Sequence, residues 1–297
     1  MGALACSGDD EGGSATSDDD RADNAVDVTG DWAVEDPEDH GLDPDRLEEA
    51  RAYAFAEGRN TQGVVVVRDG VIVAEWYADG AGPDSWAASW SMAKSFTSAT
   101  VGIAIEQGLV PGTDEPMATY YPEFAGTPRE DMTVRDVLQM GSGLDWVENY
   151  SPESIGESDI IRMVTGESDQ LAYAASRPAA VAPGSRWSYS SGDTQLLSGV
   201  LAQATGVAAD EYARDVLFDP IGMTQVEWWR DAAGNTLTYC CLDATSRDFA
   251  RLGLLYLQGG RWGDEQVVPE HWVDESLQPS PASEAAGEPY GYQWWLG

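Results

Sequence analysis

Residues 91–108 read SMAKSFTSATVGIAIEQG, a run of small and apolar side chains that ends at Gly108. The apolar residues recur at helical spacing, which predicts a mostly buried helix. Ser91 and Lys94 are three positions apart, so on a helix they share one face with Cβ atoms about 5–6 Å apart. Lys94 is the sole lysine of the chain, and a charged side chain is unusual in so apolar a segment.

Outward from this helix, the pattern changes to strands and back to helices. The Asp43-Pro44 pair predicts a helix start, with Gly58 as the stop. Two β-branched runs around Asp69-Gly70 predict a hairpin over residues 62–80. Helices are also predicted after Thr133, at 192–206 and at 245–260, and an aromatic-rich strand at 290–297.

This order predicts an α/β (α+β) fold with one domain over residues 30–297. An antiparallel sheet begins at the hairpin and resumes at the C-terminal end, helices flank it, and an all-helical region of about residues 110–245 is inserted between the strands. The functional cleft is expected between the sheet and the helical region.

The composition and net charge of the chain indicate which classes of binding partner to expect. The chain has 297 residues, 42% of them hydrophobic, which is enough for a large core, and a net charge of −36. A protein with so large a negative charge repels nucleic acid and anionic membrane surfaces, so neither is expected as a partner. Oligomeric state is left open.

The first 29 residues are too polar to bury a core and are expected to be a disordered acidic tail. Cys6 follows Leu4-Ala5 as in the end of a bacterial lipoprotein signal, which would make the chain an exported surface or periplasmic lipoprotein held to the membrane through Cys6 alone. The apolar segment that such a signal needs is not present before Ala3, so an ordinary tail is the alternative. No run of residues is apolar enough for a membrane helix.

The sequence gives little support to a Ser-His-Asp triad, a nucleophile elbow or a metal site. A Ser-His-Asp triad needs a histidine, and His40 and His271 both lie in polar segments typical of surface or structural histidines. There is no G-x-S-x-G elbow, and no spacing typical of a metal site, so neither a metal nor an organic cofactor is expected. Cys240 and Cys241 are adjacent and are expected to be buried thiols.

Ser91 and Lys94 therefore remain as the candidate nucleophile and base. A buried lysine can accept a proton near neutral pH because burial lowers its pKa; the alternative is a solvated helix lysine. Tyr189 precedes two serines and a predicted helix start, where it could relay a proton to the leaving group or merely pack as an aromatic side chain.

Four segments resemble, in the same order, the landmarks of the class C β-lactamase-like enzymes in the β-lactamase and penicillin-binding-protein superfamily. They are SMAKSF from Ser91, TVRDVLQMGSGLDW (133–146), PGSRWSYSSGDTQLL from residue 183 and SRDFARLGLLYLQGGRWGDEQVVPEHWV from residue 246. The similarity is greatest to the nylon-oligomer (6-aminohexanoate-dimer) hydrolases and related esterases. It implies a β-lactamase/transpeptidase-like fold with Ser91, Lys94 and Tyr189 as catalytic residues.

The resemblance also implies substrate-binding roles. Ser191 stands where the Tyr-x-Asn motif usually has asparagine, and Tyr150 matches a tyrosine that contacts the substrate amide. The third motif, Lys-Thr-Gly or His-x-Gly, is not found, so the last strands and one of two expected oxyanion donors would lie beyond residue 297, the other donor being the Ser91 N–H. The chain is accordingly expected to be truncated at its C-terminus.

The predicted function is cleavage of small-molecule amide or ester bonds through an acyl-enzyme on Ser91, with β-lactams and short amide oligomers among the possible substrates. The alternative from another class is a catalytically inactive, surface-tethered binding protein that keeps the penicillin-binding fold.

Overall fold

The computed structural model describes residues 26, 28 and 30–297. Cys6, the predicted lipidation site, lies outside these residues. The folded part begins earlier than predicted, because Val28 is buried and its carbonyl accepts a hydrogen bond of 2.9 Å from Arg251. The predicted tail boundary at residue 29 is therefore wrong by a few residues.

The strands are short and every pairing between them is antiparallel. They are β1 Gly63–Arg68, β2 Val71–Tyr77, β3 Trp86–Ala88, β4 Val226–Trp228, β5 Leu242–Thr245, β6 Arg261–Trp262 and β7 Glu265–Gln266. They form a β1-β2 hairpin, a three-stranded sheet in the order β3-β5-β4, and a β6-β7 pair.

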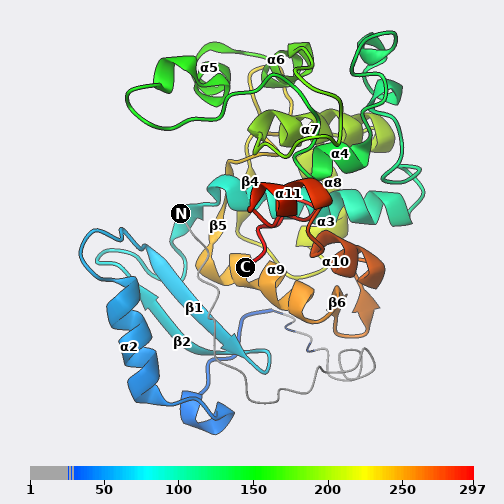
Figure 1. Cartoon of the computed structure of the whole chain (residues 1–297). Helices are drawn as coiled ribbons and strands as arrows, with labels where there is room; N and C mark the ends of the chain where they lie inside the picture. The colour runs from blue at the N-terminus through cyan, green and yellow to red at the C-terminus, as the bar shows by residue number, and fades with distance from the viewer. Residues whose placement is uncertain (1–25, 27, 29) are drawn as a thin grey trace.

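Most of the regular secondary structure is helical. The α-helices are α2 Pro44–Ala54, α3 Ala93–Glu106, α4 Val134–Leu138, α5 Asp159–Gly166, α6 Gln170–Ser176, α7 Ser191–Thr205, α8 Ala209–Ala213, α9 Ser246–Leu257, α10 Glu270–Ser276 and α11 Pro281–Ala286. The 3₁₀ turns are η1 Pro37–His40, η2 Trp90–Met92, η3 Met117–Thr119, η4 Pro122–Phe124 and η5 Ile155–Glu157, and η6 Arg214–Phe218 is a π-helical turn. Figure 1 shows α4 to α7 gathered at one end of the molecule, with the hairpin and α2 at the other.

Helix α3 runs through the core, as its sequence predicts. Residues 93–104 are buried without interruption, and the helix packs against α7 and α10. At Gly102 the ring of Trp272 lies so close that a Cβ atom would come within 2.4 Å of it. Gly102 thus allows Trp272 of α10 to approach the backbone of α3.

The hairpin is confirmed, with Gly63 opposite Tyr77 and Arg68 opposite Val71. Asp69 and Gly70 at its turn both have positive φ, as a tight turn between twisted strands requires. Helix α9 packs against β1 and connects this unit to the rest of the molecule.

Two expectations about strands are wrong. Residues 290–297 form a turn closed by a single bridge between Tyr290 and Trp295, because the backbone reverses at Gln293, whose φ is 63°. The region 110–245 is not all helical, since β4 and β5 lie within it and pair with β3. Three-residue strands such as these carry too little periodicity to be predicted.

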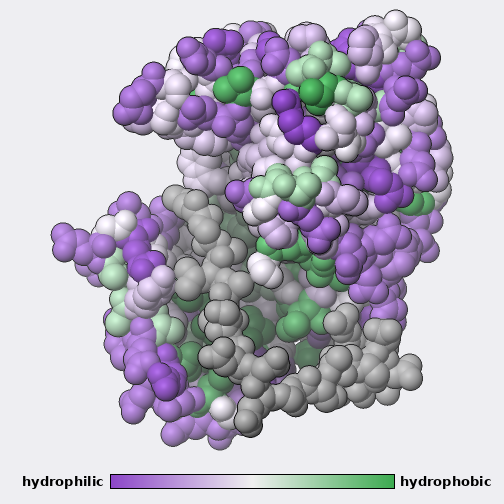
Figure 2. All heavy atoms as spheres, viewed as in Figure 1, coloured by the Kyte–Doolittle hydropathy of each residue, from purple (hydrophilic) through white to green (hydrophobic). Residues whose placement is uncertain are grey.

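The surface in Figure 2 is mainly hydrophilic, as the acidic composition predicts, and is hollowed between the helical end and the hairpin. None of the helices within the described residues is long and apolar enough to cross a membrane.

Candidate active site

Ser91 lies in the helical turn η2, directly before α3. Its neighbour Trp90 has a φ of 47°, a left-handed conformation that is uncommon for so bulky a residue. The turn is fixed to the three-stranded sheet, because Ser89 N donates to Leu242 O (2.8 Å) and Leu242 N donates to Ser89 Oγ (3.2 Å). Ser91 itself is exposed, so a substrate can reach its hydroxyl.

Lys94 is 1% exposed and directs its Nζ atom to three oxygens. These are Ser91 Oγ at 3.4 Å, Ser191 Oγ at 3.1 Å and the carbonyl of Tyr239 at 3.0 Å. Burial lowers the pKa of Lys94 to about 8, while the carboxylate of Glu148 opposes that shift. The side chain can therefore release and accept a proton near neutral pH, and it is not the solvated helix lysine of the alternative interpretation.

Tyr189 lies beside this pair. Its ring centroid is 5.0 Å from Lys94 Nζ, and its hydroxyl is near enough to Ser91 for that serine to oppose part of the rise in the Tyr189 pKa. The ring stacks on Trp295 with centroids 5.3 Å apart, which fixes its plane. Burial raises the pKa of Tyr189 to about 12, so the phenol keeps its proton at neutral pH and can donate it.

Ser191 is the first residue of α7, and both of its hydrogen-bond donors point to one carboxylate. Its backbone N–H donates to Glu148 Oε2 (2.6 Å) and its hydroxyl donates to Glu148 Oε1 (2.8 Å). Tyr150, which is 59% exposed, donates its hydroxyl to the same Oε1 atom at 2.7 Å. Tyr150 thus lies at the edge of the site, joined to it through Glu148.

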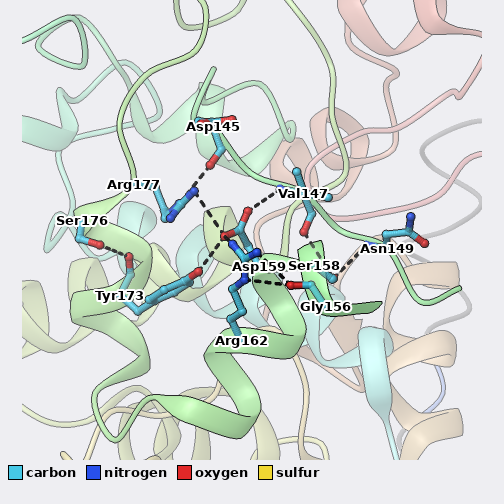
Figure 3. Close-up of polar contacts among 10 residues, drawn as sticks. All are labelled: Asp145, Val147, Asn149, Gly156, Ser158, Asp159, Arg162, Tyr173, Ser176 and Arg177. Carbon is cyan, nitrogen blue, oxygen red and sulfur yellow. Dashed lines mark hydrogen bonds and ion pairs between the residues drawn. The ribbon is translucent and has the colours of Figure 1, made fainter. Parts of the chain in front are cut away.

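The segment that carries Glu148 and Tyr150 is held in place by Asp159, at the start of α5 (Figure 3). Asp159 is 1% exposed, and its carboxylate accepts hydrogen bonds from Val147 N (2.8 Å) and the Tyr173 hydroxyl (2.7 Å). The guanidinium of Arg177 pairs with it at 3.3 Å. One buried carboxylate therefore fixes the backbone next to Glu148.

The carbonyl that accepts from Lys94 belongs to Tyr239, and the next two residues are joined by a disulfide between Cys240 and Cys241. The expectation of buried thiols is therefore wrong. Adjacent cysteines cannot form a long-range bridge with each other, but they can close a small ring, and here Cys241 has the positive φ of a tight turn.

The structure brings Ser91, Lys94, Tyr189 and Ser191 into one cluster and attaches Tyr150 through a residue that the sequence did not single out. Glu148 was overlooked because it is one of 52 acidic residues and belongs to no recognisable spacing.

The histidine considered for a catalytic triad, His40, bridges Glu35 and Asp69 at 2.9 and 3.0 Å. Across the described part of the chain, no group of three or more His, Cys, Asp and Glu side chains is placed to hold a metal ion.

The fold agrees with the comparison to known families. The profile of the family described as Beta-lactamase matches residues 45–297. The chain belongs to this family. The match covers every residue of the cluster, from Ser91 to Ser191 and Tyr239.

Relatives within the Beta-lactamase fold are distant in sequence. The 6-aminohexanoate-dimer hydrolase of Paenarthrobacter ureafaciens is 26% identical over 267 residues, which is 84% of this chain, and the chain spans 65% of that relative's length. A Bacillus anthracis structure provisionally named a 6-aminohexanoate-dimer hydrolase is similar with a TM-score of 0.69, 22% identity, and coverage of 92% of this chain and 75% of that one.

The octameric penicillin-binding protein homologue of Pyrococcus abyssi has a TM-score of 0.65 and 21% identity, over 85% of this chain and 64% of that one. At these identities the solved structures establish the fold, while the substrate has to be argued from the residues of this chain.

Proposed function

We propose that this chain is a serine hydrolase that cleaves amide or ester bonds of small molecules through an acyl-enzyme on Ser91. The observation that carries the proposal is the contact of 3.4 Å between Ser91 Oγ and the Nζ atom of a completely buried lysine. A hydroxyl becomes a useful nucleophile when an adjacent base takes its proton, and a desolvated lysine supplies such a base.

In the proposed mechanism, Lys94 accepts the hydroxyl proton as Ser91 Oγ attacks the carbonyl carbon. The backbone N–H of Ser91 is the expected donor to the developing oxyanion. Tyr189, as a protonated phenol beside Lys94, passes a proton to the leaving group and is reprotonated from Lys94. Water then attacks the acyl-enzyme by the reverse relay and releases the acid.

The relatives support amide bonds as the first substrates to test, since one is named for hydrolysis of an amide dimer. Esters belong to the same proposal because they react through the same tetrahedral intermediate with a better leaving group.

The test is labelling of the purified chain with a fluorescent phosphonate, with mass spectrometry to locate the adduct. We expect the adduct on Ser91, its loss in Ser91→Ala, and its retention in Ser185→Ala, which removes an exposed serine elsewhere. Turnover of p-nitrophenyl butyrate should follow the same order. Equal labelling of Ser91→Ala would refute the proposal, and no labelling with intact folding would favour an inactive binding protein.

A further inference from the structure

Glu148 is the point at which the hydrogen bonds behind the site converge. Its carboxylate accepts from Trp146 Nε1 (2.8 Å), the Tyr150 hydroxyl (2.7 Å), and both the N–H and the hydroxyl of Ser191. Four donors from three residues therefore fix both carboxylate oxygens. A carboxylate held so completely is a rigid negative charge rather than a mobile surface group.

The hydroxyl of Ser191 connects this charge to Lys94. A hydroxyl has one hydrogen, and here it is directed to Glu148 Oε1, so a lone pair of Ser191 Oγ is left to accept from Lys94 Nζ at 3.1 Å. When Lys94 is an ammonium, its three hydrogens have three oxygen acceptors, the third being the carbonyl of Tyr239. The protonated state of the lysine is thus completely hydrogen-bonded although it is buried.

We propose that Glu148 is a positioning residue that stabilises the ammonium form of Lys94 through Ser191 while Ser91 is being activated. The inference rests on the proposed function. In the step concerned, the O–H bond of Ser91 breaks, its electron pair forms the new bond to the carbonyl carbon, and the proton goes to Lys94 Nζ. Glu148 gains no proton, and its part resembles that of the aspartate that supports the histidine of a Ser-His-Asp triad.

The surroundings of Lys94 make Glu148 the group to test. The side chain faces Tyr189 from the segment before α7, Ser191 from α7 itself, Tyr239 from the turn before β5, and Glu148 from the segment 145–150. Burial lowers the pKa of Lys94 and Glu148 raises it. Removing the carboxylate charge should therefore lower the pKa further and make Lys94 a weaker base.

Because Lys94 is the sole lysine, protein labelled with ε-¹³C-lysine gives one side-chain lysine signal whose titration reports this group directly. We expect Glu148→Gln to move the midpoint to lower pH by about one unit, and the acid limb of kcat/KM to move with it. The plateau of kcat should fall by about threefold, and by no more than tenfold, since general-base efficiency follows basicity only in part. Glu153→Gln, an exposed change of equal charge in the next turn of chain, should change none of these.

A second variant tests the same contact in case Glu148→Gln does not fold. Ser191→Ala removes the bridging hydroxyl but leaves the Glu148 charge, and it should also lower the lysine midpoint; Glu148→Gln added to it should lower the midpoint by less than it does alone. A midpoint that stays at the wild-type value in both variants overturns the inference. If the midpoints move as expected but the wild-type chain does not acylate Ser91, the contact is established and the proposed hydrolase function is what fails.

Discussion

Replacing Lys94 with methionine should change how the free energy of unfolding depends on pH. The native chain buries this amine completely and lowers its pKa from 10.5 to about 8, whereas the unfolded chain exposes it. Between these two values the unfolded state binds more protons than the native state. The stability of the wild-type chain must therefore rise with pH across this interval.

The size of the effect follows from the shift. One pKa unit corresponds to about 1.4 kcal/mol, so between pH 7 and pH 10 the titration of Lys94 should add about 2.5 kcal/mol to the free energy of unfolding. The Lys94→Met variant has no amine to titrate and should lack this rise. It also leaves Ser191 and the carbonyl of Tyr239 without their donor, a loss that lowers stability to a similar extent at every pH.

Urea unfolding of both proteins at pH 7 and pH 10 measures the prediction. The tyrosines that titrate near pH 10 are common to both proteins, so their contribution cancels in the difference between the two. We expect that difference to widen by about 2.5 kcal/mol in favour of the wild type as the pH rises. Parallel stability curves would show that Lys94 is hydrated in solution and would remove the basis for treating it as a base.

Three further predictions concern the scaffold. Gly102→Ala should destabilise the chain by about 1–3 kcal/mol in urea unfolding, because the new Cβ would lie 2.4 Å from the ring of Trp272; an unchanged midpoint would contradict this packing. Asp159→Ala should lower the free energy of unfolding by about 3 kcal/mol, since it leaves the donors that pair with this carboxylate without a partner. Amide hydrogen exchange at residues 145–150 should accelerate in this variant, and unchanged exchange would argue against Asp159 as the anchor of that segment. The peptide containing Cys240 and Cys241 should be two hydrogens lighter by mass spectrometry until it is reduced, and free alkylation of both cysteines without a reductant would contradict the disulfide.

The sequence was most informative where one element carries several independent signals. Helix α3 has its periodicity, its glycine stop and the paired Ser91 and Lys94, and the structure agrees on all three except that Ser91 lies in the turn before the helix. The hairpin at Asp69-Gly70 was equally clear because its turn chemistry and its β-branched strands point to the same structure.

The sequence failed where tertiary contacts override local preference. Aromatic residues at 290–297 favour a strand, yet Gln293 is buried between α4 and α7, where it donates to the carbonyl of Leu138 (2.9 Å) and accepts from Thr194 (2.6 Å). Those contacts require a reversal of the chain. Glu148 was missed for a related reason, since only the folded chain shows which acidic side chain faces Ser191.

The departure at Ser191, where the resembling enzymes usually have asparagine, is chemically consistent with the rest of the cluster. A group at this position has to accept from Lys94 and donate to Glu148, and a hydroxyl does both, as an amide would with its oxygen and its nitrogen. Complete burial alone would make Lys94 a poor base, and full exposure would leave it protonated at neutral pH. A pKa of about 8 lies between these limits because the carboxylate, held one hydroxyl away, offsets part of the cost of burial.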